Sequence, residues 1–238
     1  MIDIAKNLEE VQQKIDRAVQ KSPSKSNVTL VAVTKNHPAE MVKTAIDHGV
    51  KNIGENRIQE AVEKFSELDL TGVTKHLIGH LQTNKVKKAV ENFDLIHSID
   101  SEHLLNAIAK SAETIGKIQD VLIQINLVHE ETKSGIDLDS LDSLIKLSQT
   151  LSNIRLRGLM FIAPNFENIE QTRPLFKKMF NIFTNLQNQA RDNDFRDCDQ
   201  IKILSMGMTH DFEIAIEEGA THVRIGTGIF GVRNYEGG

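Results

Sequence analysis

Lys35 is the residue of this sequence best suited to covalent chemistry. It directly follows VTLVAVT (28–34), an apolar, β-rich run of strand length. A lysine that projects from the end of such a strand is partly desolvated, and burial lowers the pKa of an amine. The neutral amine is the nucleophile that forms Schiff bases with carbonyl compounds. Alternatively, the side chain extends to solvent beside Asn36, as the long lysine stem allows.

Two segments rich in glycine and hydroxyl residues are suited to binding an anion. They are SMGMT (205–209) and RIGTGIFG (224–231), and each lies at the end of an apolar run. Glycine lets backbone N–H groups approach an oxyanion closely, and serine or threonine adds hydroxyl donors. Glycine also serves turns and helix caps, so either segment alone is a weak signal. Together they indicate a phosphate site.

Arg224 lies within the apolar run THVRIG (221–226). A guanidinium on such a strand must find hydrogen-bond acceptors, because burying it unpaired costs a large desolvation energy. One interpretation is a structural ion pair with Glu213, Glu217 or Glu218. The other is a functional contact, in which the guanidinium donates to a phosphate or to the ring nitrogen of a cofactor.

These side chains need a scaffold, and the chain alternates strand and helix patterns along its length. Apolar residues at helical spacing predict a first helix over 4–19. The expected strands are 28–35, 51–55, 75–80, 94–100, 120–127, 155–162, 201–205 and 221–226. The later helices are expected over 38–49, 57–66, 85–92, 138–151, 169–191 and 210–218, with one more beginning near Ser101. This alternation predicts an α/β fold, a single (β/α)8 TIM-type barrel over residues 1–238 with an additional N-terminal helix. An open, doubly wound sheet is the alternative.

The barrel fold also predicts where the chemistry lies, since active sites of such barrels occupy the carboxyl ends of the strands. Polar residues end or follow several of the expected strands: Lys35, Glu55, Asn56, His80, Ser205 and Arg224. A phosphate site after the seventh and eighth strands is a recurrent feature of this fold. We therefore expect these side chains to meet at one mouth of the barrel.

Composition and charge exclude several other classes of protein. The formal net charge is −5, whereas a general nucleic-acid binder carries a basic surplus. Cys198 is the only cysteine, so no disulfide within the chain or cysteine-rich metal site can form. No metal site is expected from His76 and His80, which share one expected strand without obvious carboxylate partners. With no secretory signal and no membrane-spanning run, we expect a cytoplasmic protein.

Motifs spread over most of the chain resemble one known family. They are VAVTK (31–35), IGENRIQE (53–60), LIGHLQTNK (77–85), IHSIDS (96–101), KSG (133–135), LRGLM (156–160), LSMGMTHDFEIAI (204–216) and VRIGTGIFGVR (223–233). In this order and register the sequence resembles the YggS/PROSC-like pyridoxal phosphate homeostasis proteins, relatives of the barrel domain of alanine racemases.

The resemblance implies pyridoxal 5′-phosphate as the cofactor, held as a Schiff base on Lys35. It implies cofactor-binding roles for Asn56 and His80 in the pocket, for Ser205, Met206, Gly207, Gly226 and Thr227 around the phosphate, and for Arg224 at the pyridine nitrogen. Arginine keeps its proton at any relevant pH, so it donates to that nitrogen and makes the ring a poorer electron sink. Deep carbanion chemistry is thereby suppressed.

Three functions are compatible with these residues. The resemblance favours a binding protein for intracellular vitamin B6 homeostasis, which stores a reactive aldehyde and delivers it to apo forms of enzymes that need it. A racemase of low activity is the alternative, but it needs a base on each face of the substrate. Related racemases draw one base from a second domain, for which we expect no room, and Tyr235 lies in the tail. The third is an isomerase acting on a phosphorylated substrate without cofactor. We expect a monomer.

Overall fold

The structure is a computed structural model, and it describes residues 2–23, 25, 27–128 and 134–231. In this part of the chain, eight parallel strands close into a barrel in the order β1-β2-β3-β4-β5-β6-β7-β8. The strands are β1 Thr29–Val33, β2 Asn52–Glu55, β3 Thr74–Leu77, β4 Leu95–Ile99, β5 Gln119–Ile125, β6 Ile154–Phe161, β7 Ile203–Met208 and β8 His222–Ile225. The first strand pairs with the last, with Thr29 opposite His222 and Ala32 opposite Ile225. This closure rules out the open sheet.

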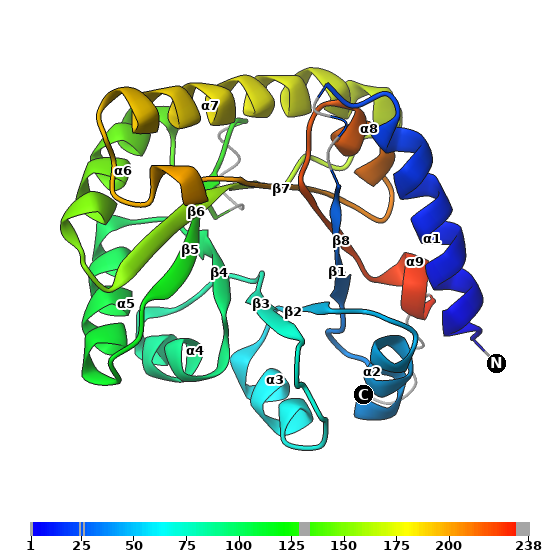
Figure 1. Ribbon diagram of the computed structural model, residues 1–238. Helices are drawn as coiled ribbons and strands as arrows, with labels where there is room; N and C mark the ends of the chain where they lie inside the picture. Colours follow the sequence, from blue (N-terminus) through cyan, green and yellow to red (C-terminus); the bar gives the residue numbers. More distant parts are fainter. Residues whose placement is uncertain (1, 24, 26, 129–133, 232–238) are drawn as a thin grey trace.

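Helices surround the barrel, as Figure 1 shows. They are α1 Ile4–Val19, α2 Ala39–Asp47, α3 Ile58–Phe65, α4 Val86–Asn92, α5 Glu102–Thr114, α6 Leu141–Thr150, α7 Arg173–Asp192, α8 Phe212–Glu217 and α9 Thr227–Phe230. Short 3₁₀ turns lie at Thr83–Lys85, Leu138–Ser140, Ile169–Thr172 and Cys198–Gln200. In the described ranges, no helix is both long enough and apolar enough to cross a bilayer.

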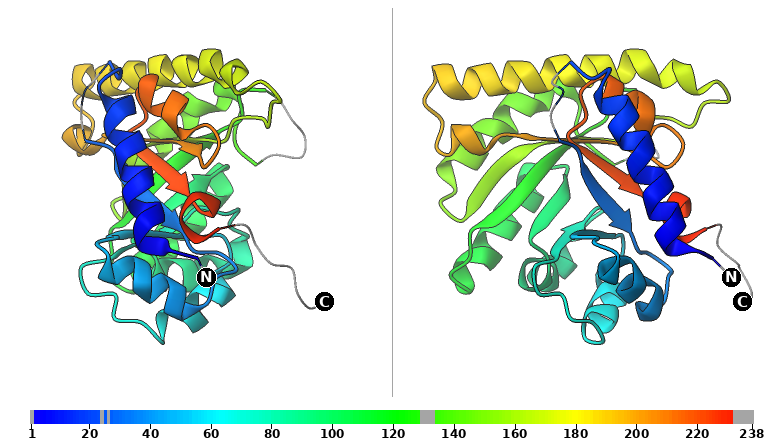
Figure 2. Two further views of the ribbon diagram at one scale, coloured as in Figure 1. Left: turned by 90° about the vertical axis from the view of Figure 1, so that its right-hand side faces the viewer. Right: turned by 45° about the vertical axis from the view of Figure 1, so that its right-hand side comes forward.

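The additional N-terminal helix α1 lies outside the barrel against α8 and α9 (Figure 2). Its sequence dictates this, because its buried residues recur every three or four positions: Ile4, Leu8, Val11, Ile15 and Ala18. Asp3 caps the helix by accepting a 3.0 Å hydrogen bond from the amide of Lys6. The Asn7 side chain donates to the carbonyl of Ile229, which ties α1 to α9.

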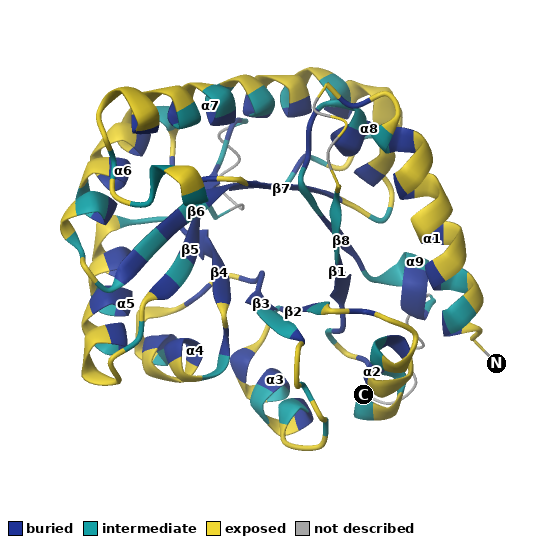
Figure 3. Cartoon of the chain, viewed as in Figure 1, coloured by how far each residue is buried: buried dark blue, intermediate teal, exposed yellow. Residues whose placement is uncertain are grey.

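Alternation along the strands divides the core into two parts. Side chains on the outer faces of the strands pack against the helices, and Figure 3 shows the buried residues on the strands and the inner helix faces. A smaller apolar cluster, separate from that layer, comprises Leu95, Leu122, Met160 and Ile203 of four consecutive strands. These positions alternate with the outer ones, so this cluster fills the barrel interior on the side of β4 to β7.

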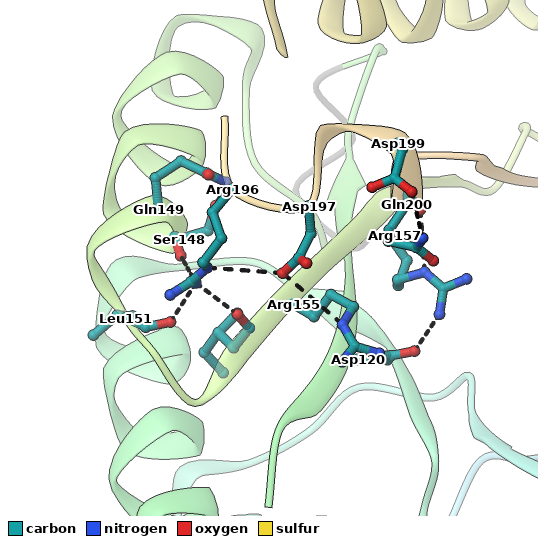
Figure 4. Close-up of polar contacts among 11 residues, drawn as sticks. Asp120, Ser148, Gln149, Leu151, Arg155, Arg157, Arg196, Asp197, Asp199 and Gln200 are labelled. Carbon is teal, nitrogen blue, oxygen red and sulfur yellow. Dashed lines mark hydrogen bonds and ion pairs between the residues drawn. The ribbon is translucent and has the colours of Figure 1, made fainter. Parts of the chain in front are cut away.

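The amino ends of β5 and β6 are held together by charged side chains (Figure 4). Asp120 of β5 accepts from Arg157 and lies 3.4 Å from the guanidinium of Arg155, both on β6. Arg196 donates to the carbonyls of Leu151 at 2.7 Å and Ile154 at 2.9 Å, where α6 ends and β6 begins. These contacts therefore tie β5 to β6 and hold the start of β6 at the end opposite the carboxyl mouth.

Candidate functional site

A cavity of about 280 Å³ opens at the carboxyl ends of the strands. Its lining residues come from β1, β7 and β8 and from the loops after β1, β2, β3, β6, β7 and β8. They are Val33, Lys35, Asn56, Ile78, Ile162, Met208, Thr209, His210, Arg224, Gly226 and Thr227. Five of the residues expected from the sequence thus line one cavity: Lys35, Asn56, Arg224, Gly226 and Thr227.

The backbone around Lys35 is fixed on both sides. The carbonyl of Thr34 accepts a 2.7 Å hydrogen bond from Nζ of Lys64 on α3. The amide of Asn36 donates to the carboxylate of Glu60, also on α3, and Asn36 adopts a left-handed conformation with φ of 60°. Helix α3 therefore holds both peptide units that flank Lys35, which fixes where its side chain leaves the chain.

Glu55 and Lys64 form a buried ion pair behind this segment. Nζ of Lys64 lies 2.6 Å from Oε1 of Glu55, and the Thr34 hydroxyl donates to the same oxygen at 2.6 Å. Burial raises the pKa of the Glu55 carboxyl, against the hydrogen bonds from Lys64 and Thr34, which lower it. Glu55 was expected at the mouth with Asn56, but it faces α3, because adjacent strand residues point to opposite sides.

Arg224 is buried at the floor of the cavity, with 3% of its surface exposed. Nη1 donates to the Ser205 hydroxyl at 2.7 Å, and Nη2 donates to the carbonyl of Phe161 at 2.9 Å. Burial lowers the pKa of this guanidinium to about 10, although the negative charge of Asp211 opposes the shift. With two neutral acceptors as its hydrogen-bond partners, it is a buried cation that faces a cavity.

The alternative of a structural ion pair for Arg224 is wrong. Glu217 and Glu218 bind Arg173 instead, at 2.8 and 3.0 Å. Arg224 lies on the inner face of β8, whereas those glutamates belong to α8 and its end on the outside. The barrel wall therefore separates them from its guanidinium.

The loops after β7 and β8 form one wall of the cavity. The amide of Gly226 donates to the Thr209 hydroxyl at 3.3 Å, which joins the two loops. A Cβ at Gly226 would lie 3.3 Å from the carbonyl oxygen of Val33, so glycine leaves room in this wall. Thr227 begins α9, and the first amides of a helix have no carbonyl partner within it. This wall therefore offers amide and hydroxyl donors.

Three residues of the expected phosphate cradle are absent from the cavity lining among the described residues. Ser205 is fully buried behind Arg224, to which its hydroxyl is bonded. Met206 points outward into the core between strands and helices. Gly207 packs against α8, where a Cβ would lie 2.6 Å from that of Ala215. The sequence pattern placed the end of β7 at 205, whereas the strand continues to Met208.

His80 lines a neighbouring cleft of about 440 Å³, which also includes Asn56. Its Nδ1 lies 3.2 Å from the carboxylate of Asp100 and 3.3 Å from the Ser134 hydroxyl. The expectation that His76 and His80 share a strand is wrong, since β3 ends at Leu77. His76 points into the barrel, and His80 belongs to the loop at its mouth.

A line of polar side chains inside the barrel was not found from the sequence. The Ser205 hydroxyl lies 3.1 Å from Nδ1 of His97, and Nε2 of His97 lies 2.9 Å from Nδ1 of His76. Nε2 of His76 in turn lies 3.0 Å from Oδ1 of Asn52. Burial lowers the pKa of His76 to about 4 and that of His97 well below its usual value. Both rings are therefore neutral at physiological pH.

Comparison with known proteins places this barrel in a family. The sequence pattern of the alanine racemase N-terminal domain matches residues 6–234. A pyridoxal phosphate homeostasis protein of Aquifex aeolicus is 39% identical over 235 residues, which cover 98% of this chain and 100% of that protein. The chain belongs to this family. The protein of the same name from Escherichia coli is 41% identical over 240 residues, 99% of either chain.

Solved structures of the family share the fold. PipY of Synechococcus elongatus, solved with pyridoxal phosphate bound, has a TM-score of 0.83 and is 38% identical, over 96% of this chain and 100% of that one. Alanine racemase of Clostridium difficile is 15% identical, with a TM-score of 0.68 over 97% of this chain and 58% of the racemase. This second likeness shows the fold alone.

Proposed function

We propose that this chain binds pyridoxal 5′-phosphate in the cavity at the carboxyl mouth and takes part in its intracellular homeostasis. The observation that carries the proposal is the meeting of three groups in one cavity: the amine of Lys35, the guanidinium of Arg224 and the donor wall at Gly226 and Thr227. The named relatives and the pyridoxal phosphate in PipY support the same ligand.

The residues present fit this group. The cavity volume of about 280 Å³ lies near the lower end of the roughly 300–1,000 Å³ usual for small-molecule pockets. Arg224 has further N–H groups beyond those bonded to Ser205 and Phe161, so it can donate to a ring nitrogen. Gly226 lets the loop after β8 lie close to Val33 of β1, because a Cβ there would come within 3.3 Å of the Val33 carbonyl oxygen.

Pyridoxal phosphate supplies an aldehyde that condenses reversibly with an amine. Lys35 is the residue positioned to attach it, because α3 fixes the peptide units on both sides of this lysine. The amide and hydroxyl of Thr227 and the hydroxyl of Thr209 would hold the phosphate. Arg224 would donate to the ring nitrogen and, with its high proton affinity, keep that nitrogen unprotonated. These roles suit storage and release of the cofactor rather than turnover.

Delivery to other proteins is tested by transfer. The loaded protein is mixed with the apo form of a pyridoxal phosphate-dependent enzyme, with a scavenger present that removes free cofactor. We expect the enzyme to regain activity faster than it does with the same amount of free cofactor. Equal rates would contradict delivery, and multi-turnover formation of D-alanine from L-alanine by the loaded protein would contradict a storage role.

A further inference from the structure

The polar side chains inside the barrel form a hydrogen-bonded series with one possible direction. Oδ1 of Asn52 can only accept, so the neutral ring of His76 has its proton on Nε2 and accepts on Nδ1 from His97. At the other end the guanidinium can only donate, so Ser205 accepts from Arg224 and donates its own O–H to Nδ1 of His97. His97 then carries its proton on Nε2 and donates it to Nδ1 of His76. His76 likewise donates from Nε2 to Oδ1 of Asn52. We call this series, Asn52–His76–His97–Ser205–Arg224, the interior chain.

The direction of the interior chain stabilises the charge of Arg224. Ser205, His97 and His76 each accept on the side toward Arg224 and donate on the far side, so their dipoles present their negative ends to the guanidinium. Hydrogen bonds aligned in this way polarise one another in a medium of low dielectric constant. The series thus provides part of the support that a carboxylate would give, without neutralising the cation.

The interior chain also fixes the orientation of Arg224. Two of its nitrogens are bonded on the inner side, one to Ser205 and one to the Phe161 carbonyl. His97 and Ser205 are completely buried, and His76 is 1% exposed, so packing holds each ring in place. The guanidinium therefore keeps one face toward the cavity. We propose that Ser205, His97 and His76 are positioning residues that hold Arg224 aimed at the cofactor ring.

This inference rests on the proposed function, and the barrel interior offers a matched control. His222 lies on β8, with its ring centre 6.4 Å from that of His76. Its Nδ1 contacts the Thr221 hydroxyl at 3.0 Å, so it is outside the interior chain. Burial lowers its pKa to about 3, and it too is neutral. His222→Phe therefore removes a partly buried histidine next to His76 without breaking the series.

The first experiment determines the ring tautomers of the cofactor-free protein by long-range proton–nitrogen NMR. The interior chain requires both His76 and His97 to be neutral at neutral pH, with the proton on Nε2. A proton on Nδ1 of either ring, or a doubly protonated ring, would overturn the proposal. This readout needs no cofactor, so it is independent of the proposed function.

The second experiment measures dissociation constants for pyridoxal phosphate in Ser205→Ala, His97→Phe and His222→Phe. Ser205→Ala removes only the hydroxyl group, so it tests the proposal even if His97→Phe fails to fold. We expect binding to weaken by about tenfold in the first two variants, since each leaves a buried polar group without its partner. In His222→Phe it should stay within about twofold of the original protein.

Inorganic phosphate distinguishes positioning from general damage to the site. The affinity of the protein for inorganic phosphate should be the same in all three variants. The interior chain contacts Arg224 and not the wall formed by Gly226 and Thr227. Parallel loss of phosphate binding, or equal weakening in His222→Phe, would overturn the proposal. If the unaltered protein binds phosphate but no pyridoxal phosphate, the proposed function fails instead.

Discussion

Nζ of Lys64 lies 2.6 Å from Oε1 of Glu55 and 2.7 Å from the carbonyl oxygen of Thr34. One buried ammonium group thus joins helix α3, strand β2 and the last peptide unit before Lys35. Alternation along the strands places this ammonium group outside the barrel. Thr34 and Glu55 point outward, whereas Lys35 and Asn56 point into the mouth. A pair outside the cavity therefore determines the placement of the amine inside it.

Lys64→Met should destabilise the protein by about 3 kcal/mol or more, because it leaves the buried carboxylate of Glu55 without its cation. Urea unfolding measures this change. The double variant Lys64→Met/Glu55→Gln is the control, since a neutral pair carries no uncompensated charge. We expect it to be more stable than Lys64→Met alone. If the two variants are equally stable, the charge of Glu55 is not the cause.

Thr227→Val should weaken binding of the phosphorylated cofactor selectively. The substitution keeps the size of the side chain and removes one hydroxyl donor from the cavity wall. A lost hydrogen bond to a charged group corresponds to about 1.5–3 kcal/mol, or roughly 10–100-fold in affinity. Absorbance titration with pyridoxal phosphate and with unphosphorylated pyridoxal measures the difference. An equal loss of affinity for both compounds would show that Thr227 does not contact the phosphate group.

Arg224→Glu should change the absorption spectrum of the bound cofactor. A carboxyl group at this position accepts from a protonated ring nitrogen, whereas the guanidinium donates to an unprotonated one. The spectra of the two loaded proteins are compared at neutral pH, after circular dichroism has shown that the barrel is intact. Identical spectra would mean that Arg224 does not face the ring nitrogen.

Acid should destabilise the protein through the histidines inside the barrel, whose pKa values are lowered. The pKa falls from an ordinary 6.5 to about 4 for His76 and about 3 for His222, so below pH 6.5 the unfolded chain binds protons that the folded barrel does not. This contribution to stability is complete above that pH and is lost as the pH falls toward 4. The loss is about 1.4 kcal/mol per pH unit for each histidine.

Urea unfolding at neutral pH and at about pH 5 measures this loss, and His222→Phe supplies the comparison. The variant has one histidine of lowered pKa fewer, so its stability should fall less steeply with acid than that of the original protein. Equal slopes would mean that His222 takes up protons in the folded state.

The fold was predictable because its signals are local and repeated. Apolar strand runs alternate with helical periodicity, and the residues that follow the strands mark the mouth, which places Lys35, Asn56, Arg224, Gly226 and Thr227 correctly in one cavity. The strand ends carry weaker local signals. One misplaced end, at β7, was enough to assign Ser205 to the phosphate wall instead of the barrel interior.

The interior chain was not predictable by the same reasoning. His76, His97 and Ser205 come from three strands, and their contacts depend on the pairing of β3 with β4 and on the approach of β4 and β7 across the closed barrel, which no local pattern contains. Alternation gives a partial signal, since His222 and Arg224 are two residues apart on one strand and must share a face. The other residues of the interior chain come from different strands and meet only when the barrel is closed.

The central claim concerns the Lys35 amine, and reductive trapping tests it most directly. The protein is incubated with pyridoxal phosphate, reduced with borohydride, digested and mapped by mass spectrometry, with Lys35→Ala as the control. We expect one added pyridoxyl group, on the peptide that contains Lys35, and none on the corresponding peptide of the variant. A pyridoxyl group on a different lysine, or none at all, would contradict the account.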